Sequence, residues 1–433
     1  MDKFLKILVG FLGLLLAAGP AWGQLDNRAF ISQLPGKQEY SIYYVKSNTQ
    51  SPEQHRSIDS LNKQTDELKR RFPDRFSNDS LSTSRRPRAG ELRLSIHAFT
   101  FFKDNEYFNE INEGYTLFGT QLNPQLVYYP IKELRLEAGV FLWKDFGNPV
   151  LQQVRPTFRA TWTRGNNEFI FGNIRPHLHH DYIEPLYDFE SVMLRPLEEG
   201  LQFRRQSRRL FLDAWVNWLR QQYVGSTYQE EIAGGLSSSF RLTGDDSPVQ
   251  LNLPFQFTAR HFGGQIDVVR LPVRTYFNYA SGLVARRQIG RGALQAVRLN
   301  AYGLLFADNS SIFALPFQRG HALYLNGTLE TRYGDLMLSY WRGSNYYSPL
   351  GGPYYQSVAS IYGTPGFTDP ERRLLLVRLL RDFRVSDAAA VMVRVEPVYD
   401  FNKKLLDFSF GVYLNFRQEW LLGNVGRRVR VGQ

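Results

Sequence analysis

The stretch LDFSFGVYLNF, residues 406–416, alternates strictly between two kinds of side chain. In an extended strand, one face would carry Leu406, Phe408, Phe410, Val412, Leu414 and Phe416, and the other Asp407, Ser409, Gly411, Tyr413 and Asn415. One continuous apolar face and one small or polar face are typical of a barrel wall with lipid outside and water inside. This pattern therefore favours a transmembrane β-barrel over a soluble fold.

The N-terminus indicates export. Lys3 and Lys6 precede an apolar run at 7–18, and the small residues around Ala21 and Gly23 form a cleavage site, so residues 1–23 are predicted to be a signal peptide. The run is shorter than the roughly 20 residues that a spanning helix needs, and no second such run follows. Because only helices and closed barrels satisfy their backbone groups in lipid, a membrane-embedded mature chain must be a closed barrel.

Composition agrees with this fold class. Aromatic residues make up 15% of the 433 residues, yet the mean hydropathy is negative, as expected when apolar and polar residues alternate. The absence of cysteine excludes disulfides, thiolate metal sites and a lipidated N-terminal cysteine. The net charge is +11, but the basic residues are dispersed through strand-like segments and the signal directs export, so we expect no nucleic-acid partner.

Three zones follow the signal peptide. Residues 24–90 are polar and are expected to form a periplasmic or plug-like extension, with a helix within 52–72. Residues 91–416 are predicted to form an antiparallel barrel of about sixteen strands. We place the strands near 91–102, 115–129, 133–146, 152–164, 168–176, 199–207, 209–221, 231–242, 249–262, 271–286, 293–306, 320–333, 335–344, 372–383, 388–401 and 404–416. Residues 417–433 are expected to be a basic tail.

The predicted connections alternate in length, as they do in such barrels. From a periplasmic N-terminus, every second connection would be a short periplasmic turn. The longest connections, at 103–114, 177–198, 307–319 and 345–371, would then all lie on the outer side.

Residues 91–416 resemble a bacterial outer-membrane β-barrel of the sixteen-stranded porin type. Ser409, Gly411, Leu414 and Phe416 resemble the C-terminal signal that the outer-membrane insertion machinery reads in that class, although here residues 417–433 follow it. The resemblance implies the outer membrane of a Gram-negative bacterium, with lipid and the insertion machinery as partners and no cofactor. The aromatic, loop-rich style is similar to barrels of Bacteroidetes-like bacteria.

The third outer loop, 177–198, is the first candidate site. In sixteen-stranded porins the third loop folds into the barrel, and its acids face basic residues on the wall. The predicted constriction joins the loop acids Asp181, Glu184, Asp188 and Glu190 to the inward arginines Arg155, Arg159 and Arg175. Such a transverse field would sort charged solutes. The alternative is a solvated acidic loop.

The same loop carries His177, His179 and His180. Imidazole is a good ligand for zinc or copper, so these residues are weak metal candidates, although solvated loop histidines are commoner.

The last long outer loop carries Tyr346, Tyr347, Tyr354 and Tyr355. Flat aromatic rings suit stacking on a sugar or peptide, so these residues are predicted to form a binding surface. Loop packing is the alternative.

Three functions remain open from the sequence. The leading hypothesis is a passive channel for small, preferably anionic, solutes. The second is a plugged barrel whose outer loops bind a glycan, a surface polysaccharide or a protein. The third is an outer-membrane hydrolase, for which His97, His261 and His321 are the isolated histidines. Phosphate-binding loops, Gly-x-Ser-x-Gly and His-Glu-x-x-His motifs are absent, so we predict that the protein is not an enzyme.

Overall fold

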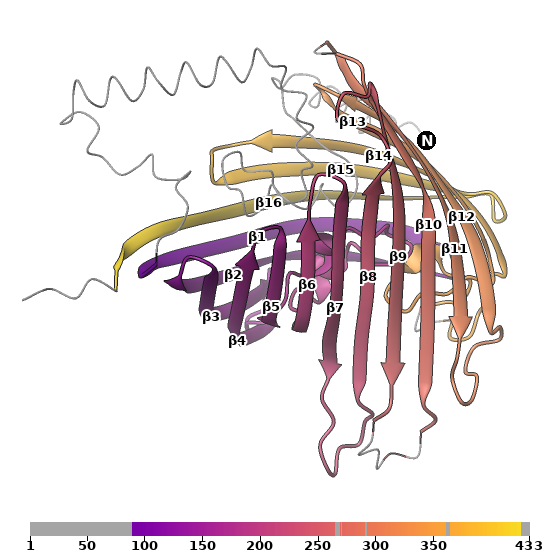
Figure 1. The fold of residues 1–433 in the computed structure, drawn as a ribbon. Coiled ribbons are helices and arrows are strands. Elements are labelled where there is room, and N and C mark those ends of the chain that lie inside the picture. Colours follow the sequence, from indigo (N-terminus) through magenta and orange to yellow (C-terminus); the bar gives the residue numbers. More distant parts are fainter. Residues whose placement is uncertain (1–88, 265–268, 270, 291, 361–363, 426–433) are drawn as a thin grey trace, which may run out of the picture.

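The computed structural model describes residues 89–425, apart from 265–268, 270, 291 and 361–363. The strands are β1 (Glu91–Phe108), β2 (Glu113–Ile131), β3 (Leu134–Asp145), β4 (Gln153–Arg164), β5 (Asn167–Asn173), β6 (Glu199–Gln206), β7 (Leu210–Arg220), β8 (Glu231–Arg241), β9 (Val249–Phe262), β10 (Arg274–Gln288), β11 (Leu294–Asp308), β12 (Arg319–Thr331), β13 (Gly334–Ser344), β14 (Glu371–Arg384), β15 (Ala389–Asp400) and β16 (Leu405–Asn424). Each pairs antiparallel with its sequence neighbours, and β16 pairs with β1 to close the barrel (Figure 1). The predicted sixteen-stranded antiparallel barrel is confirmed.

Alternation of side chains along each strand creates the two faces of the wall. In β12, Leu323, Leu325 and Leu329 are exposed on the outer face, while Tyr324 and Asn326 are buried on the inner face. The outer face therefore meets lipid, and the polar and aromatic side chains point into the lumen.

Two strands, β1 and β16, run well past the ends that the sequence suggested. The first, β1, continues to Phe108, so the loop expected at 103–114 shrinks to residues 109–112. Its inward side chains, Lys103 and Asn105, are polar but buried in the lumen, so their polarity does not end the strand. The other, β16, continues to Asn424 and pairs with the start of β1, so the tail expected from residue 417 begins later.

Several predictions concern residues that the structure does not describe. The signal peptide, nearly all of the 24–90 extension and its helix at 52–72, and residues 426–433 lie outside the described residues. Among the described residues, no helix combines the length and apolar character needed to cross a bilayer.

The lumen contains a core of its own. Two connections enter it: the inner loop, residues 174–198, and the tyrosine loop, residues 345–360. The inner loop carries η4 (His177–His180) and α3 (Ser191–Leu194), and the tyrosine loop carries η5 (Pro353–Tyr355). Their side chains pack with the wall into one buried cluster that includes Tyr182, Leu186, Tyr187, Trp215, Tyr302, Tyr324, Trp341, Tyr346, Leu350 and Tyr355. In Figure 1 the inner loop lies inside the barrel, behind β6.

Candidate functional site in the lumen

A buried carboxylate closes the inner loop on itself. Glu198, the last loop residue, accepts hydrogen bonds from the backbone N–H of His177 at 2.9 Å and from the Tyr187 hydroxyl at 2.7 Å. The Nε2 of His180 lies 2.9 Å from the other Glu198 oxygen. On its far side, His180 Nδ1 lies 3.4 Å from the carboxylate of Asp213 on β7. The first helical turn of the loop is thereby tied to its end and to the wall.

This arrangement fixes the charges of the network. Burial disfavours a charged imidazole, but Glu198 and Asp213 outweigh it and raise the pKa of His180 to about 9. Burial likewise disfavours a charged Glu198, but His177 and His180 outweigh it and hold the pKa of that carboxyl well below its usual range. His180 is therefore an imidazolium between two carboxylates. Over the described part of the chain, no group of three or more His, Asp or Glu side chains has the geometry to hold a metal ion.

His179 points to a different environment, here called the histidine cavity. The cavity is lined by polar residues that include His97, Arg159, Arg175, His177 and His179, and by apolar residues that include Phe99, Phe141 and Leu178. Burial, and then the positive charges of Arg175, Arg204 and Arg159, lower the pKa of His179 well below its usual range. Its imidazole is therefore neutral at neutral pH.

A second cluster joins the inner loop to β1 and β2. Glu190 accepts hydrogen bonds from the Tyr115 hydroxyl and from Asn105, and it lies 3.5 Å from Lys103 Nζ. Burial, and then the nearby charge of Glu190, raise the pKa of Asp188 to about 7. The inner loop thus carries one buried carboxyl group, Asp188, that titrates near neutral pH.

The three arginines of the predicted constriction have partners on their own side of the barrel. Arg155 pairs with Glu199 at 2.6 Å, and Arg175 pairs with Glu168 at 3.1 Å. Arg159 donates to two backbone carbonyls at the start of the inner loop.

The acids of the inner loop face other parts of the wall. Glu184 pairs with Arg378 on β14, and Glu190 pairs with Lys103 on β1. The backbone carbonyl of Asp181 accepts a hydrogen bond from Gln256 at 2.9 Å. The sequence-based pairing of the loop acids with Arg155, Arg159 and Arg175 is therefore not the arrangement in the structure, because each arginine has a nearer acceptor.

The predicted loop tyrosines are packing residues. Tyr346, Tyr354 and Tyr355 are buried, and Tyr347 is half-buried. The Tyr346 hydroxyl donates to the Pro185 carbonyl at 3.0 Å, so the tyrosine loop holds the inner loop in place. These rings line the lumen core instead of the exposed surface that the sequence suggested, because the loop folds inward.

The residues of the assembly pattern lie in the middle of β16. Ser409 and Gly411 face the lumen, and Leu414 and Phe416 face outward, with eight further strand residues after them. Whether the insertion machinery reads them stays a prediction.

The isolated histidines occupy three settings. His97 lines the histidine cavity, and His321 is exposed on the outer face of β12. At the outer end of β9, His261 Nδ1 lies 2.8 Å from the Thr275 hydroxyl of β10.

Sequence reasoning placed Asp213 among the acids that face the lumen, but it did not join Glu198 and Asp213 in a network around His180. The available signal for Asp213 was one acid inside the apolar run LFLDAWVNWL of β7. An inward acid in such a strand requires a partner in the lumen.

A profile of the lipid A 3'-O-deacylase-type family matches residues 81–425, which is most of the chain. The chain belongs to this family. Deacylases are hydrolases, so the sequence-based prediction that the protein is not an enzyme is wrong. No protein of curated function matches the chain.

Solved structures with a similar fold are outer-membrane proteins. The loop L8 deletion mutant of OmpT from Vibrio cholerae is 12% identical with a TM-score of 0.46, over 77% of this chain and 100% of that one. OprD from Pseudomonas aeruginosa is 9% identical with a TM-score of 0.46, over 78% and 97%. OpdL from Pseudomonas aeruginosa is 13% identical with a TM-score of 0.47, over 76% and 99%. This member of the deacylase-type family is a closed sixteen-stranded antiparallel β-barrel.

Proposed function

We propose that this protein is an outer-membrane hydrolase that removes an ester-linked acyl chain from lipid A or a similar acylated glycolipid. The family match over residues 81–425 supports the reaction class. The observation that carries the proposal is the histidine cavity, which joins the neutral imidazole of His179, the guanidinium groups of Arg159, Arg175 and Arg417, and apolar side chains.

Ester hydrolysis needs a base for the attacking water and positive charge at the carbonyl oxygen. His179 takes a proton from water as the water oxygen attacks the acyl carbon. Arg159 and Arg175 stabilise the oxyanion that forms on the carbonyl. The bond from the acyl carbon to the sugar oxygen then breaks, and the proton passes to that oxygen, which leaves a fatty acid and a free sugar hydroxyl.

The apolar side of the cavity suits the acyl chain. Phe99, Phe141 and Leu178 belong to one buried cluster beside the polar groups. Each methylene that leaves water for such a wall contributes about 0.8 kcal/mol. The cavity thus offers an apolar wall for the chain beside polar groups for the ester.

The passive channel for small anionic solutes is the competing hypothesis. The aromatic core formed by the inner loop and the tyrosine loop occupies the lumen, which favours hydrolysis over free passage. Planar-bilayer recordings separate the two functions. We expect no steady conductance steps from well-inserted protein, and large regular steps would favour the channel.

The direct test is mass spectrometry of lipid A incubated with folded protein in detergent micelles. The wild-type protein is expected to release an acyl chain, and His179→Gln is expected to reduce the rate by about 100-fold or more, the usual contribution of a general base. His321→Gln, on the outer face, is the matched control and should retain the wild-type rate. A wild-type protein that releases no acyl chain would contradict the proposed function, whereas an active His179→Gln variant would contradict the assignment of the base.

A further inference from the structure

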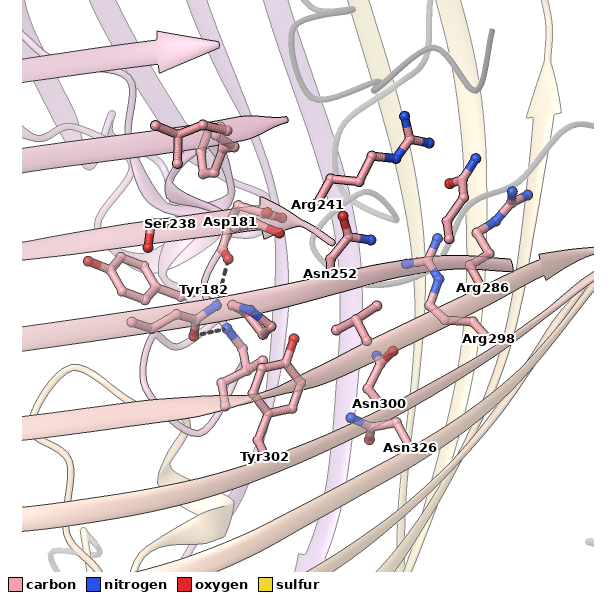
Figure 2. Close-up of a pocket in the computed structure, with 18 of the residues that line it drawn as sticks. Asp181, Tyr182, Ser238, Arg241, Asn252, Arg286, Arg298, Asn300, Tyr302 and Asn326 are labelled. Carbon is pink, nitrogen blue, oxygen red and sulfur yellow. Dashed lines mark hydrogen bonds between the residues drawn. The ribbon is translucent and has the colours of Figure 1, made fainter. Parts of the chain in front are cut away.

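A second cavity, here called the arginine cavity, lies on the opposite side of the lumen. It has a volume of about 160 Å³ and is lined by β8–β14, the inner loop and the β6–β7 turn at 207–209 (Figure 2). It shares no lining residue with the histidine cavity. Nothing in the proposed deacylation uses it.

The strand register builds one wall of this cavity as a row of amides. Asn252 on β9 and Asn300 on β11 both lie opposite Val284 of β10. Asn300 in turn lies opposite Asn326 of β12. Because residues at one register level project to the same side of a sheet, the three amides point together into the lumen, as Figure 2 shows.

Two of these amides lack protein partners. The side-chain oxygens of Asn300 and Asn326 are buried and accept no hydrogen bond from the protein, and the two residues are 7% and 5% exposed. Buried polar atoms are almost always satisfied. The two unpartnered side-chain oxygens line the same cavity and could each accept a hydrogen bond from a polar ligand.

A row of positive charge lies two residues away along the same strands. Arg286 on β10 is directly opposite Arg298 on β11. Both donate to Glu330, at 3.0 Å and 3.1 Å. Like charges directly opposite each other on a sheet are unfavourable, and the single carboxylate of Glu330 offsets only one of these two positive charges. Over the whole cavity, six arginines face two acidic residues.

An aromatic row lies on the other side of the amides. Tyr302 on β11 is directly opposite Tyr324 on β12, and both line the cavity. Along β11 the inward side chains thus run from Arg298 through Asn300 to Tyr302, at about 7 Å per step. Cation, amide and aromatic ring follow one another over the length of a small ligand.

We propose that the arginine cavity binds an anionic saccharide. Its phosphate or carboxylate lies at Arg286 and Arg298, its hydroxyl groups hydrogen-bond to Asn300 and Asn326, and its ring lies against Tyr302. Guanidinium forks suit such anions, amides suit vicinal hydroxyls, and a flat ring suits the apolar face of a sugar. This binding is independent of the proposed deacylation.

Calorimetric titration of the folded full chain in detergent micelles tests the proposal. The ligands are glucose 1-phosphate and glucuronate as anionic sugars, with glucose and inorganic phosphate as partial ligands. We expect saturable binding of at least one anionic sugar, weaker at high salt, and at least tenfold weaker binding of glucose and phosphate.

Three variants locate the site. Arg286→Gln and the double variant Asn300→Ala with Asn326→Ala are expected to weaken sugar binding at least tenfold. The double variant removes no hydrogen bond found in the protein, so it should fold, as heat-modifiable electrophoretic migration would show. Asn415→Ala, which lines the histidine cavity, is the control and should bind as the wild type does.

Three results would overturn the proposal. One is the absence of binding by either anionic sugar, and another is equally tight binding of phosphate alone. The third is unchanged affinity in folded protein carrying both asparagine substitutions. Lipid A deacylation is measured on the same samples, so that a failure of sugar binding can be told apart from a failure of the proposed hydrolysis.

Discussion

The Nε2 atom of His180 lies 2.9 Å from Oε2 of Glu198, so the first helical turn of the inner loop is bonded directly to its last residue. The His180 ring also stacks on Trp215 of β7, with ring centroids 4.6 Å apart. This one imidazole thus joins both ends of the loop to the barrel wall. The position of the inner loop should therefore depend on the charge of His180.

The loop is expected to loosen at alkaline pH. Folding raises the pKa of His180 from 6.5 to about 9, so its stabilising contribution is complete below pH 6.5 and is lost as the pH rises toward 9. Glu198 has a lowered pKa, so its contribution is present above pH 4.5 and is lost only as the pH falls below that value. Tryptophan emission should show a transition centred near pH 9, where His180 loses its proton in the folded protein. The transition should be absent from His180→Gln, and identical titrations of the two proteins would contradict this assignment.

Two adjacent glutamates should differ sharply in their effect on stability. Glu198→Gln removes a buried carboxylate beside two histidines, and breaking a buried ion pair costs about 3–5 kcal/mol. Glu199→Gln removes the half-exposed pair with Arg155, which contributes about 0–1 kcal/mol. The midpoint of urea unfolding in micelles should therefore fall strongly for Glu198→Gln and only slightly for Glu199→Gln. Equal shifts would show that the network does not hold the loop.

The barrel was predictable from sequence because its signal is local. Alternation in a stretch such as 406–416 reports both faces of the wall directly, and short turns report the strand ends. The prediction failed where polar side chains face inward, as at Lys103 and Asn105, since a lumen accepts residues that otherwise indicate a loop. Similarly, β16 continues past Phe416 because β1 offers a partner edge as far as Glu91.

The candidate sites were less predictable because they depend on contacts distant in sequence. The loop acids were recognised, but the partner of Glu184 is Arg378, almost two hundred residues away. Sequence alone does not show which of several inward arginines a loop will meet. The amide row at Asn252, Asn300 and Asn326 likewise exists only through register across four strands.

Gly235 is expected to be essential for seating the inner loop. A Cβ atom at this position would lie 2.3 Å from the Tyr182 hydroxyl, which donates to the Phe257 carbonyl at 2.9 Å. Gly235→Ala should therefore displace Tyr182 and destabilise the protein by about 1–3 kcal/mol, the usual cost of overpacking. Gly303→Ala is the control, because a Cβ there meets no atom within 4 Å. The two variants are compared by their midpoints of urea unfolding. A Gly235→Ala midpoint equal to that of the wild type would show that the inner loop has room to move.

Barrel closure should require the strand residues that follow the assembly pattern. Residues 417–424 of β16 pair with the first residues of β1, and Glu419 binds Arg93 at 2.8 Å and Arg135 at 2.9 Å. A chain that ends after Phe416 would leave that part of β1 as an unpaired edge, which a membrane does not tolerate. It should lose the heat-modifiable migration of a folded barrel.

A chain that ends after Val425 should keep that migration, because β16 remains whole. Both truncated chains retain Ser409, Gly411, Leu414 and Phe416. Comparing them therefore shows whether assembly needs only this pattern or also the pairing of residues 417–424 with β1. If the short chain also folds in the outer membrane, the pattern alone is sufficient. If only the long chain folds, pairing of β16 with the start of β1 closes the barrel, and the pattern acts inside a strand instead of at its end.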